Sequence, residues 1–101
     1  MHPDHPILQR ASSYKLIDFR YHGFSWTPED HYIQMTLLKV DEVVKLRFDG
    51  PRQLTSNDYF PTQIGLYISD IRSDGLEDLS VEVGDFEYQS LHFFAKTVTR
   101  V

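Results

Sequence analysis

Cysteine is absent from this chain of 101 residues. Its absence excludes disulfides, thiolate metal ligands and a cysteine nucleophile. Long apolar runs are also missing, so the sequence predicts no membrane-spanning segment and no action at a membrane. The opening MHPDHP lacks the basic-then-apolar pattern of a secretory signal. We therefore expect a cytoplasmic protein.

Alternating apolar and polar residues, the period of a β-strand, run through most of the chain. Turn residues separate these segments at intervals of about ten residues. Side chains expected to face inward are Ile17, Phe19 and Tyr21; Val44, Leu46 and Phe48; Ile64, Leu66 and Ile68; and Leu79, Val81 and Val83. Gly84-Asp85 reads as a turn, and residues 91–101 read as one closing strand. The pattern predicts an all-β fold: a mostly antiparallel meander, sandwich or partly open barrel.

Residues 28–40 fit two structures. Thr27-Pro28-Glu29-Asp30 has the cap, proline and acids of a helix start, and the apolar residues that follow fit a helical stripe. The same residues alternate as a strand would, and Asp41-Glu42 would then connect two strands tightly. The strand is favoured, and the alternative is an α+β fold with one helix at about 28–40.

The chain divides into two parts. Residues 1–13 contain Pro3, Pro6 and Ser12-Ser13, a composition that predicts a loose N-terminal arm or one laid over the domain. Residues 14–101 are expected to form a single β-rich domain, because a chain of this length builds one core.

Charge is distributed unevenly along the sequence. The formal net charge is −5. Residues 1–52 carry seven acids and seven bases, whereas residues 53–101 carry eight acids and three bases. Nucleic-acid binding requires a basic face, which the acidic half does not offer. We expect no nucleic-acid partner.

The acidic stretch 69–88 is a candidate metal or catalytic site. Counted from Asp70, Asp74, Gly75 and Asp78 match positions 5, 6 and 9 of a calcium loop, but Arg72 and Val81 occupy positions that need oxygen ligands. A catalytic carboxylate pair needs a concave, partly buried site, whereas these acids lie at turns or at outward strand positions. The sequence therefore predicts no metal site, no cofactor and no catalytic residue. A solvated negative surface is expected, with Asp74, Glu77, Asp78 and Asp85 facing a basic protein partner.

Aromatic and histidine side chains supply the other candidates. Trp26 and Tyr59 lie in expected loops, where exposed aromatics anchor partners. His22, His31 and His92 belong to the alternative of a small enzyme or ligand carrier, with an imidazole beside a carboxylate in a pocket. His22 and His31 flank the same expected loop. The pair His2 and His5 is better explained by adventitious than by functional metal binding.

The segments VVKLRFDGPRQLTSNDYF, IGLYISDI, LSVEV and LHFFAKTVTRV resemble small β-rich bacterial immunity proteins of polymorphic-toxin systems and related uncharacterised proteins. The shared pattern is a strand that ends in Arg-Phe, a glycine turn, an aliphatic strand, an alternating strand and a closing strand with paired aromatics. It covers residues 43–101. The resemblance implies a non-enzymatic protein that blocks a partner.

The expected function is thus that of a binding or inhibitory module whose acidic face meets a basic protein. The first alternative is the enzyme or ligand carrier that uses His22, His31 or His92. The second is a structural homo-oligomer joined through an edge strand.

Overall fold

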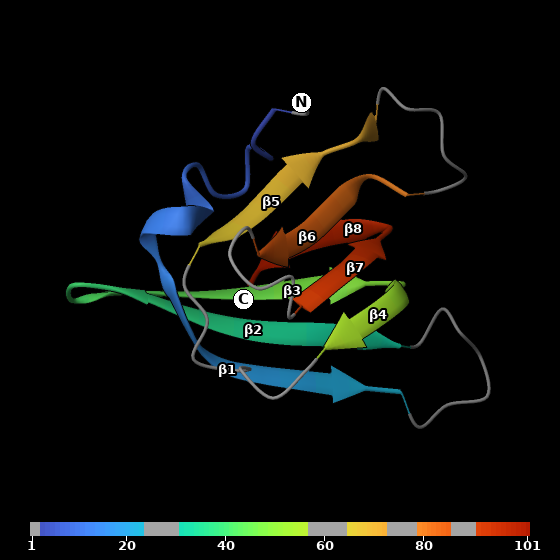
Figure 1. The fold of residues 1–101 in the computed structure, drawn as a ribbon. Helices are drawn as coiled ribbons and strands as arrows, with labels where there is room; N and C mark the ends of the chain where they lie inside the picture. Colours follow the sequence, from blue (N-terminus) through green and yellow to red (C-terminus); the bar gives the residue numbers. More distant parts are fainter. Residues whose placement is uncertain (1–2, 24–30, 57–64, 73–78, 86–90) are drawn as a thin grey trace.

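Two antiparallel four-stranded sheets make up the fold (Figure 1). The computed structural model describes residues 3–23, 31–56, 65–72, 79–85 and 91–101. The first sheet has the order β1-β2-β3-β8 and the second the order β4-β7-β6-β5. The strands are β1 (Lys15–His22), β2 (Tyr32–Lys39), β3 (Glu42–Asp49), β4 (Arg52–Ser56), β5 (Leu66–Asp70), β6 (Val81–Asp85), β7 (Leu91–Ala95) and β8 (Thr97–Arg100), and a 3-10 helix η1 (Ala11–Ser13) precedes them. The all-β prediction is confirmed.

The core is built from the apolar side chains that alternate along these strands. Phe48 of β3 and Phe93 of β7 meet edge to face with their ring centroids 5.2 Å apart, and each is fully buried. Phe48 belongs to the first sheet and Phe93 to the second, so this contact joins the sheets. The inward sets predicted for β3, β5 and β6 are confirmed for Val44, Leu46, Phe48, Leu66, Ile68, Val81 and Val83. Ile64 lies outside the described residues.

Two corners carry the chain from one sheet to the other. Between β3 and β4 the chain bends at Gly50, whose φ of 65° is readily adopted by glycine. Between β7 and β8 it bends at Lys96, and the Lys96 amide donates to the Asp49 carbonyl at 2.9 Å. The prediction of one closing strand over residues 91–101 is therefore wrong, because β7 and β8 pair in different sheets. Gly84-Asp85 also continues β6 instead of forming a turn.

A β-bulge in β1 interrupts the alternation that the sequence predicts for this strand. The register with β2 shifts between Leu16 and Asp18. The extra residue leaves Leu16 fully buried and Ile17 exposed, because a bulge exchanges the faces on either side of it. Phe19 packs against the core as expected. Tyr21 pairs with the buried Ile33 and so lies on the predicted face, but its own side chain is exposed.

The strand interpretation of the 28–40 segment holds for Tyr32–Lys39, which form β2; residues 28–30 lie outside the described part. Lys39 pairs with Glu42, so Val40 and Asp41 make a two-residue turn. Val40 has a φ of 54°, a conformation that a β-branched side chain adopts only with strain. In Figure 1 this hairpin projects beyond the rest of the fold.

Replacing Val40 with asparagine is expected to stabilise the protein by about 1 kcal/mol, because asparagine tolerates a positive φ in a two-residue hairpin turn. The side chain is 91% exposed, so the change removes no packing. Urea unfolding of wild type and Val40→Asn measures the difference. The control is Val43→Asn on the neighbouring strand, where the φ is not positive and no gain is expected. Equal or lower stability of Val40→Asn would show that the turn is unstrained.

Residues 3–13 of the arm are laid over the domain. Leu8 and Ala11 are buried and belong to the core cluster. In Figure 1 the arm lies beside β5, and the His5 amide donates to the Ile68 carbonyl at 2.8 Å. Within the described residues no helix has the length and apolarity to cross a membrane.

Candidate functional site

The outer face of the first sheet is the most distinctive described surface. It comprises the side chains of β1, β2, β3 and β8 that point away from the core. Strand pairing arranges them in four rows across the sheet. The rows are His22, Tyr32, Asp49 and Thr97; Arg20, Gln34, Arg47 and Thr99; Asp18, Thr36 and Lys45; and Lys15, Leu38 and Val43.

Tyr32 is held between two other side chains on this face. The His22 ring stacks on Tyr32 with centroids 4.4 Å apart and an interplanar angle of 15°. The guanidinium carbon of Arg47 lies 3.8 Å from the Tyr32 centroid. Because β1 and β3 flank β2 on opposite sides, the tyrosine ring is enclosed from both neighbours. A cation over an aromatic face is stabilised by the ring's quadrupole, so the arrangement fixes the three groups.

Two arginines on the outer face are oriented by neighbouring carboxylates. Arg47 Nε donates to Asp49 Oδ1 at 3.0 Å, and Arg20 Nε donates to Asp18 Oδ2 at 3.0 Å. Both arginines are exposed. Within the described part of the chain their terminal Nη groups have no hydrogen-bond partner. A guanidinium with a fixed Nε edge and free Nη groups can bind a carboxylate with two parallel hydrogen bonds.

The outer face is cationic although the chain is acidic. It carries four bases (Lys15, Arg20, Lys45 and Arg47) and two acids (Asp18 and Asp49), a net charge of +2. Both acids are engaged by the arginines. The surface is therefore complementary to an anionic partner.

An aliphatic cluster adjoins the cationic rows at the end of the β2–β3 hairpin. It consists of Ile17, Leu38, Val40 and Val43. Ile17 is 42% exposed, Val43 55% and Val40 91%, and Leu38 pairs with Val43 across the hairpin. Scattered apolar residues are normal on a surface, but neighbouring ones mark contact sites more often. We call this group the tip cluster.

The outward side chains of the second sheet contain an imidazole–carboxylate pair. His92 Nε2 lies 2.7 Å from Glu82 Oε2, and both side chains are half-buried. The Phe94 ring meets the His92 ring edge-on with centroids 5.0 Å apart. On the neighbouring strand β5, the pKa of Tyr67 is raised chiefly by burial and further by the nearby carboxylates of Glu82 and Asp85. In the segments that the structure describes, no three His, Asp or Glu side chains are grouped so as to hold a metal ion.

The other two candidate histidines have separate partners. His31 Nδ1 and the Tyr21 hydroxyl are 2.9 Å apart, and their rings meet edge to face. His22 instead stacks on Tyr32. The structure thus places both at the β1–β2 hairpin, while His92 lies in the other sheet.

Of the predicted partner-binding residues, only Asp85 is described. Its side chain is 3% exposed, and Oδ1 accepts a hydrogen bond from the Leu91 amide at 3.1 Å. Asp85 therefore joins β6 to β7 and does not belong to an exposed acidic surface. Asp74, Glu77, Asp78, Trp26 and Tyr59 lie outside the described residues.

The Tyr32 stack was missed by the sequence reasoning, although a signal for it exists. Once Val40-Asp41 is recognised as a two-residue turn, counting back along both strands pairs Tyr32 with Asp49 and Gln34 with Arg47. The aromatic and the cation then lie on one face of adjacent strands.

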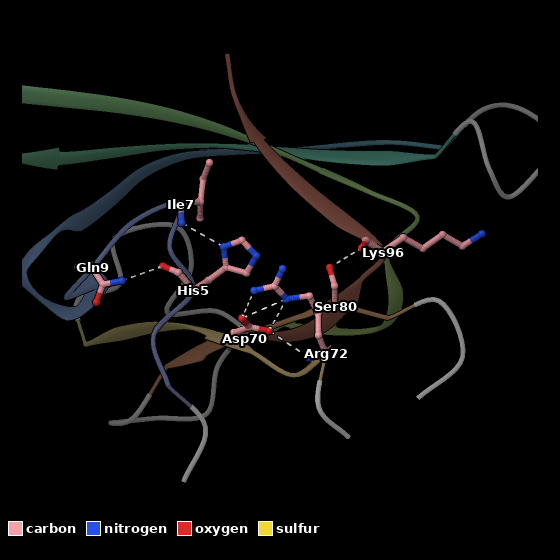
Figure 2. A network of polar contacts seen from close by, with 7 residues as sticks. All are labelled: His5, Ile7, Gln9, Asp70, Arg72, Ser80 and Lys96. Atoms are coloured by element: carbon pink, nitrogen blue, oxygen red, sulfur yellow. Dashed lines mark hydrogen bonds and ion pairs between the residues drawn. The ribbon is translucent and has the colours of Figure 1, made fainter. Parts of the chain in front are cut away.

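Figure 2 shows a further polar network, where the arm meets the end of β5. Arg72 Nε donates to Asp70 Oδ1 at 2.9 Å. The hydrogen bonds from Arg72 lower the pKa of Asp70 from 3.8 to about 2. The His5 ring is beside this pair, and its Nδ1 accepts a hydrogen bond from the Ile7 amide at 3.1 Å.

The Asp70–Arg72 pair is expected to contribute to acid stability. The folded-state pKa of Asp70 lies below its ordinary value of 3.8, so its contribution is present above that value and is lost as the pH falls toward about 2. Between pH 3.8 and about pH 2, the free energy of unfolding should therefore fall more steeply for wild type than for Arg72→Gln. Urea unfolding at a series of pH values measures the slopes, with the exposed Arg52→Gln as control. Equal slopes for wild type and Arg72→Gln would contradict the assignment.

Comparison of the chain with protein-family models, with curated proteins and with solved structures gives no match.

Proposed function

We propose that this protein is a non-enzymatic binding module and that the outer face of the first sheet meets a protein partner. The observation that carries the proposal is the Tyr32 ring held between His22 and Arg47 within a cationic face. Tyrosine and arginine are enriched at protein interfaces and dominate their binding energy. Because the ring and the guanidinium are already fixed, little conformational entropy remains to be lost on binding.

The composition of the face indicates the partner's chemistry. The Nη groups of Arg20 and Arg47, which have no hydrogen-bond partner among the described residues, match carboxylates. The net charge of +2 favours an acidic surface. The tip cluster supplies apolar area that a partner can remove from water. The resemblance to immunity proteins supports an inhibitory role, in which the partner is blocked by being covered.

The test uses affinity capture from the host, followed by measurement of the dissociation constant of the captured partner. Tyr32→Ala and Arg47→Gln are each expected to weaken binding at least tenfold, about 1.4 kcal/mol or more. Arg52→Gln, the same substitution at an exposed position of the second sheet, is the matched control and should bind as wild type does. Unchanged affinity in both outer-face variants would refute the assignment of this surface.

A basic partner is the second candidate, supported by the distribution of charge. All ten lysines and arginines lie among the described residues, whereas seven of the fifteen acids, including Asp74, Glu77 and Asp78, lie in the other segments. Steering by these acids would accelerate association with a basic protein. The triple variant Asp74→Asn/Glu77→Gln/Asp78→Asn would then associate more slowly at low salt. For an acidic partner, the same variant would associate faster, so the direction of the change decides between the two.

A further inference from the structure

The N-terminal arm forms a short extra strand on the edge of β5. Asp4 pairs with Ser69 in an antiparallel bridge. On either side of the bridge, the His5 amide donates to the Ile68 carbonyl at 2.8 Å and the Asp70 amide donates to the Pro3 carbonyl at 2.9 Å. The outward backbone groups of β5 are therefore satisfied by a segment more than sixty residues away in the sequence.

The four edge strands of the two sheets are protected in different ways. β1 and β4 each contain a register irregularity, and such bulges discourage the addition of another strand. β8 has only four residues. β5 instead keeps a regular register with β6 over five residues, and its free edge is closed by the arm. Of the four edges, β5 is therefore the one whose regular backbone pairs with an added strand.

The arm is a small unit folded on itself. The Leu8 amide donates to the His5 carbonyl at 3.2 Å, and the Arg10 amide donates to Asp4 Oδ2 at 3.0 Å. Pro3 and Pro6 lack an amide hydrogen and bracket the paired residues, so the ladder with β5 cannot lengthen in either direction. Arg10 has a φ of 55°, a left-handed conformation that is strained for arginine. Opening the turn at Arg10 would relieve this strain.

We propose that the β5 edge also accepts the arm of a second copy of this chain, which gives an arm-exchanged dimer. The contacts that residues 3–5 make with β5 would form equally between two copies. Straightening residues 6–10 breaks the Leu8–His5 and Arg10–Asp4 hydrogen bonds and withdraws Leu8 from the core, so the dimer forms at high concentration, where mass action offsets this loss. Straightening residues 6–10 gives the arm a reach of about 17 Å.

His5 makes the exchange sensitive to pH. Its Nδ1 accepts the Ile7 amide hydrogen bond, so protonation of that nitrogen removes the contact. Burial lowers the pKa of His5, while nearby Asp70 raises it and Arg72 lowers it. Other charged groups close to the turn are Asp4 and Arg10 of the arm and Arg100 of β8, which donates to the Ile7 carbonyl at 3.4 Å. Because the folded-state pKa is below 6.5, the neutral contact is fully present above that value and weakens as the pH falls. Arm opening is therefore faster in mild acid than at neutral pH.

Engineered disulfides test the proposal, because the chain has no cysteine of its own. Asp4 and Ser69 face each other as a non-hydrogen-bonded pair, with Cα atoms about 4.5 Å apart, a separation that a disulfide spans. A single Asp4→Cys variant and a single Ser69→Cys variant of different tag length are mixed at high concentration, incubated and oxidised with glutathione disulfide. The mixtures are incubated at pH 5 or pH 8, and aliquots are then all oxidised at pH 8, because the thiolate is the attacking species. The expected product is a mixed disulfide dimer that carries both tags, and it accumulates several-fold faster with incubation time at pH 5 than at pH 8.

The double variant Asp4→Cys/Ser69→Cys is the control for geometry and should form the disulfide within one chain at low concentration. A bond within the double variant, with no mixed dimer from the single variants, would show that the arm closes only its own β5. No bond in either case would refute the Asp4–Ser69 pairing itself. His5→Asn, which keeps an acceptor at the same position without titrating, should exchange at a rate independent of pH.

Light scattering on the unmodified protein gives an independent readout. A dimer fraction that rises with concentration and decays slowly after dilution agrees with exchange, whereas a monomer at every concentration overturns it. No binding partner is needed in these experiments. Their failure would leave the proposed function of the outer face untouched, and failure of that function would leave the dimer untouched.

Discussion

Phe93→Ala is expected to lower the free energy of unfolding by about 3–5 kcal/mol, the range found for large aromatic truncations in cores. Phe93 of β7 is fully buried and meets Phe48 of β3 at 5.2 Å and Phe19 of β1 at 6.5 Å between ring centroids. These partners belong to the first sheet, so the truncation leaves a cavity between the two sheets. The cost therefore combines lost burial, lost edge-to-face contacts and the cavity.

Phe94→Ala is the matched control for this prediction. Phe94 is the next residue of the same strand, points the other way and is only half-buried. Its truncation removes an edge contact to His92 but opens no cavity between the sheets. Urea unfolding monitored by circular dichroism compares the two. A larger loss for Phe94→Ala than for Phe93→Ala would mean that the sheets are not joined through Phe93.

The strands themselves could be predicted from the sequence because alternation and turn chemistry agree. Val44, Leu46 and Phe48 alternate without interruption up to Asp49-Gly50, and the structure buries all three. The bulge at Ile17 left no such signal, since Leu16 and Ile17 are both aliphatic and either one fits an inward position. Only pairing with β2 decides between them.

The division of the chain between two sheets could not be predicted. At Lys96 a single residue separates β7 from β8, with neither glycine nor proline to mark the bend. Its conformation is set by long-range hydrogen bonds, such as the one from the Lys96 amide to the Asp49 carbonyl. A sequence pattern reports local periodicity, whereas a corner of this kind depends on contacts between distant strands.

The candidate site shows the same limit. The sequence predicts Asp85 on a surface turn, because it follows Gly84 and because aspartate is rarely buried without a partner. Asp85 has such a partner in the Leu91 amide. Asp18, Arg20 and His22 alternate in the sequence with Phe19 and Tyr21, but the meeting of His22, Tyr32 and Arg47 requires the register of three strands.

Asp85→Ala is expected to destabilise the protein by about 2 kcal/mol, because it leaves the buried Leu91 amide without its acceptor. The hydrogen bond from Leu91 to Asp85 Oδ1 links the end of β6 to the start of β7, and Asp85 is only 3% exposed, so the Leu91 amide lies away from bulk solvent. Hydrogen exchange should show faster exchange of the Leu91 amide in this variant, in addition to the shift of the urea midpoint.

Asp85→Asn separates the hydrogen bond from the loss of side-chain volume. The asparagine Oδ1 can accept from the Leu91 amide in the same position, so protection of that amide should stay close to wild type and most of the stability should remain. If Asp85→Asn and Asp85→Ala were equally destabilised, the accepting oxygen would not be what holds the two strand ends together. If neither variant were destabilised, Asp85 would be exposed in solution. The prediction that it lies on an acidic partner-binding surface would then stand.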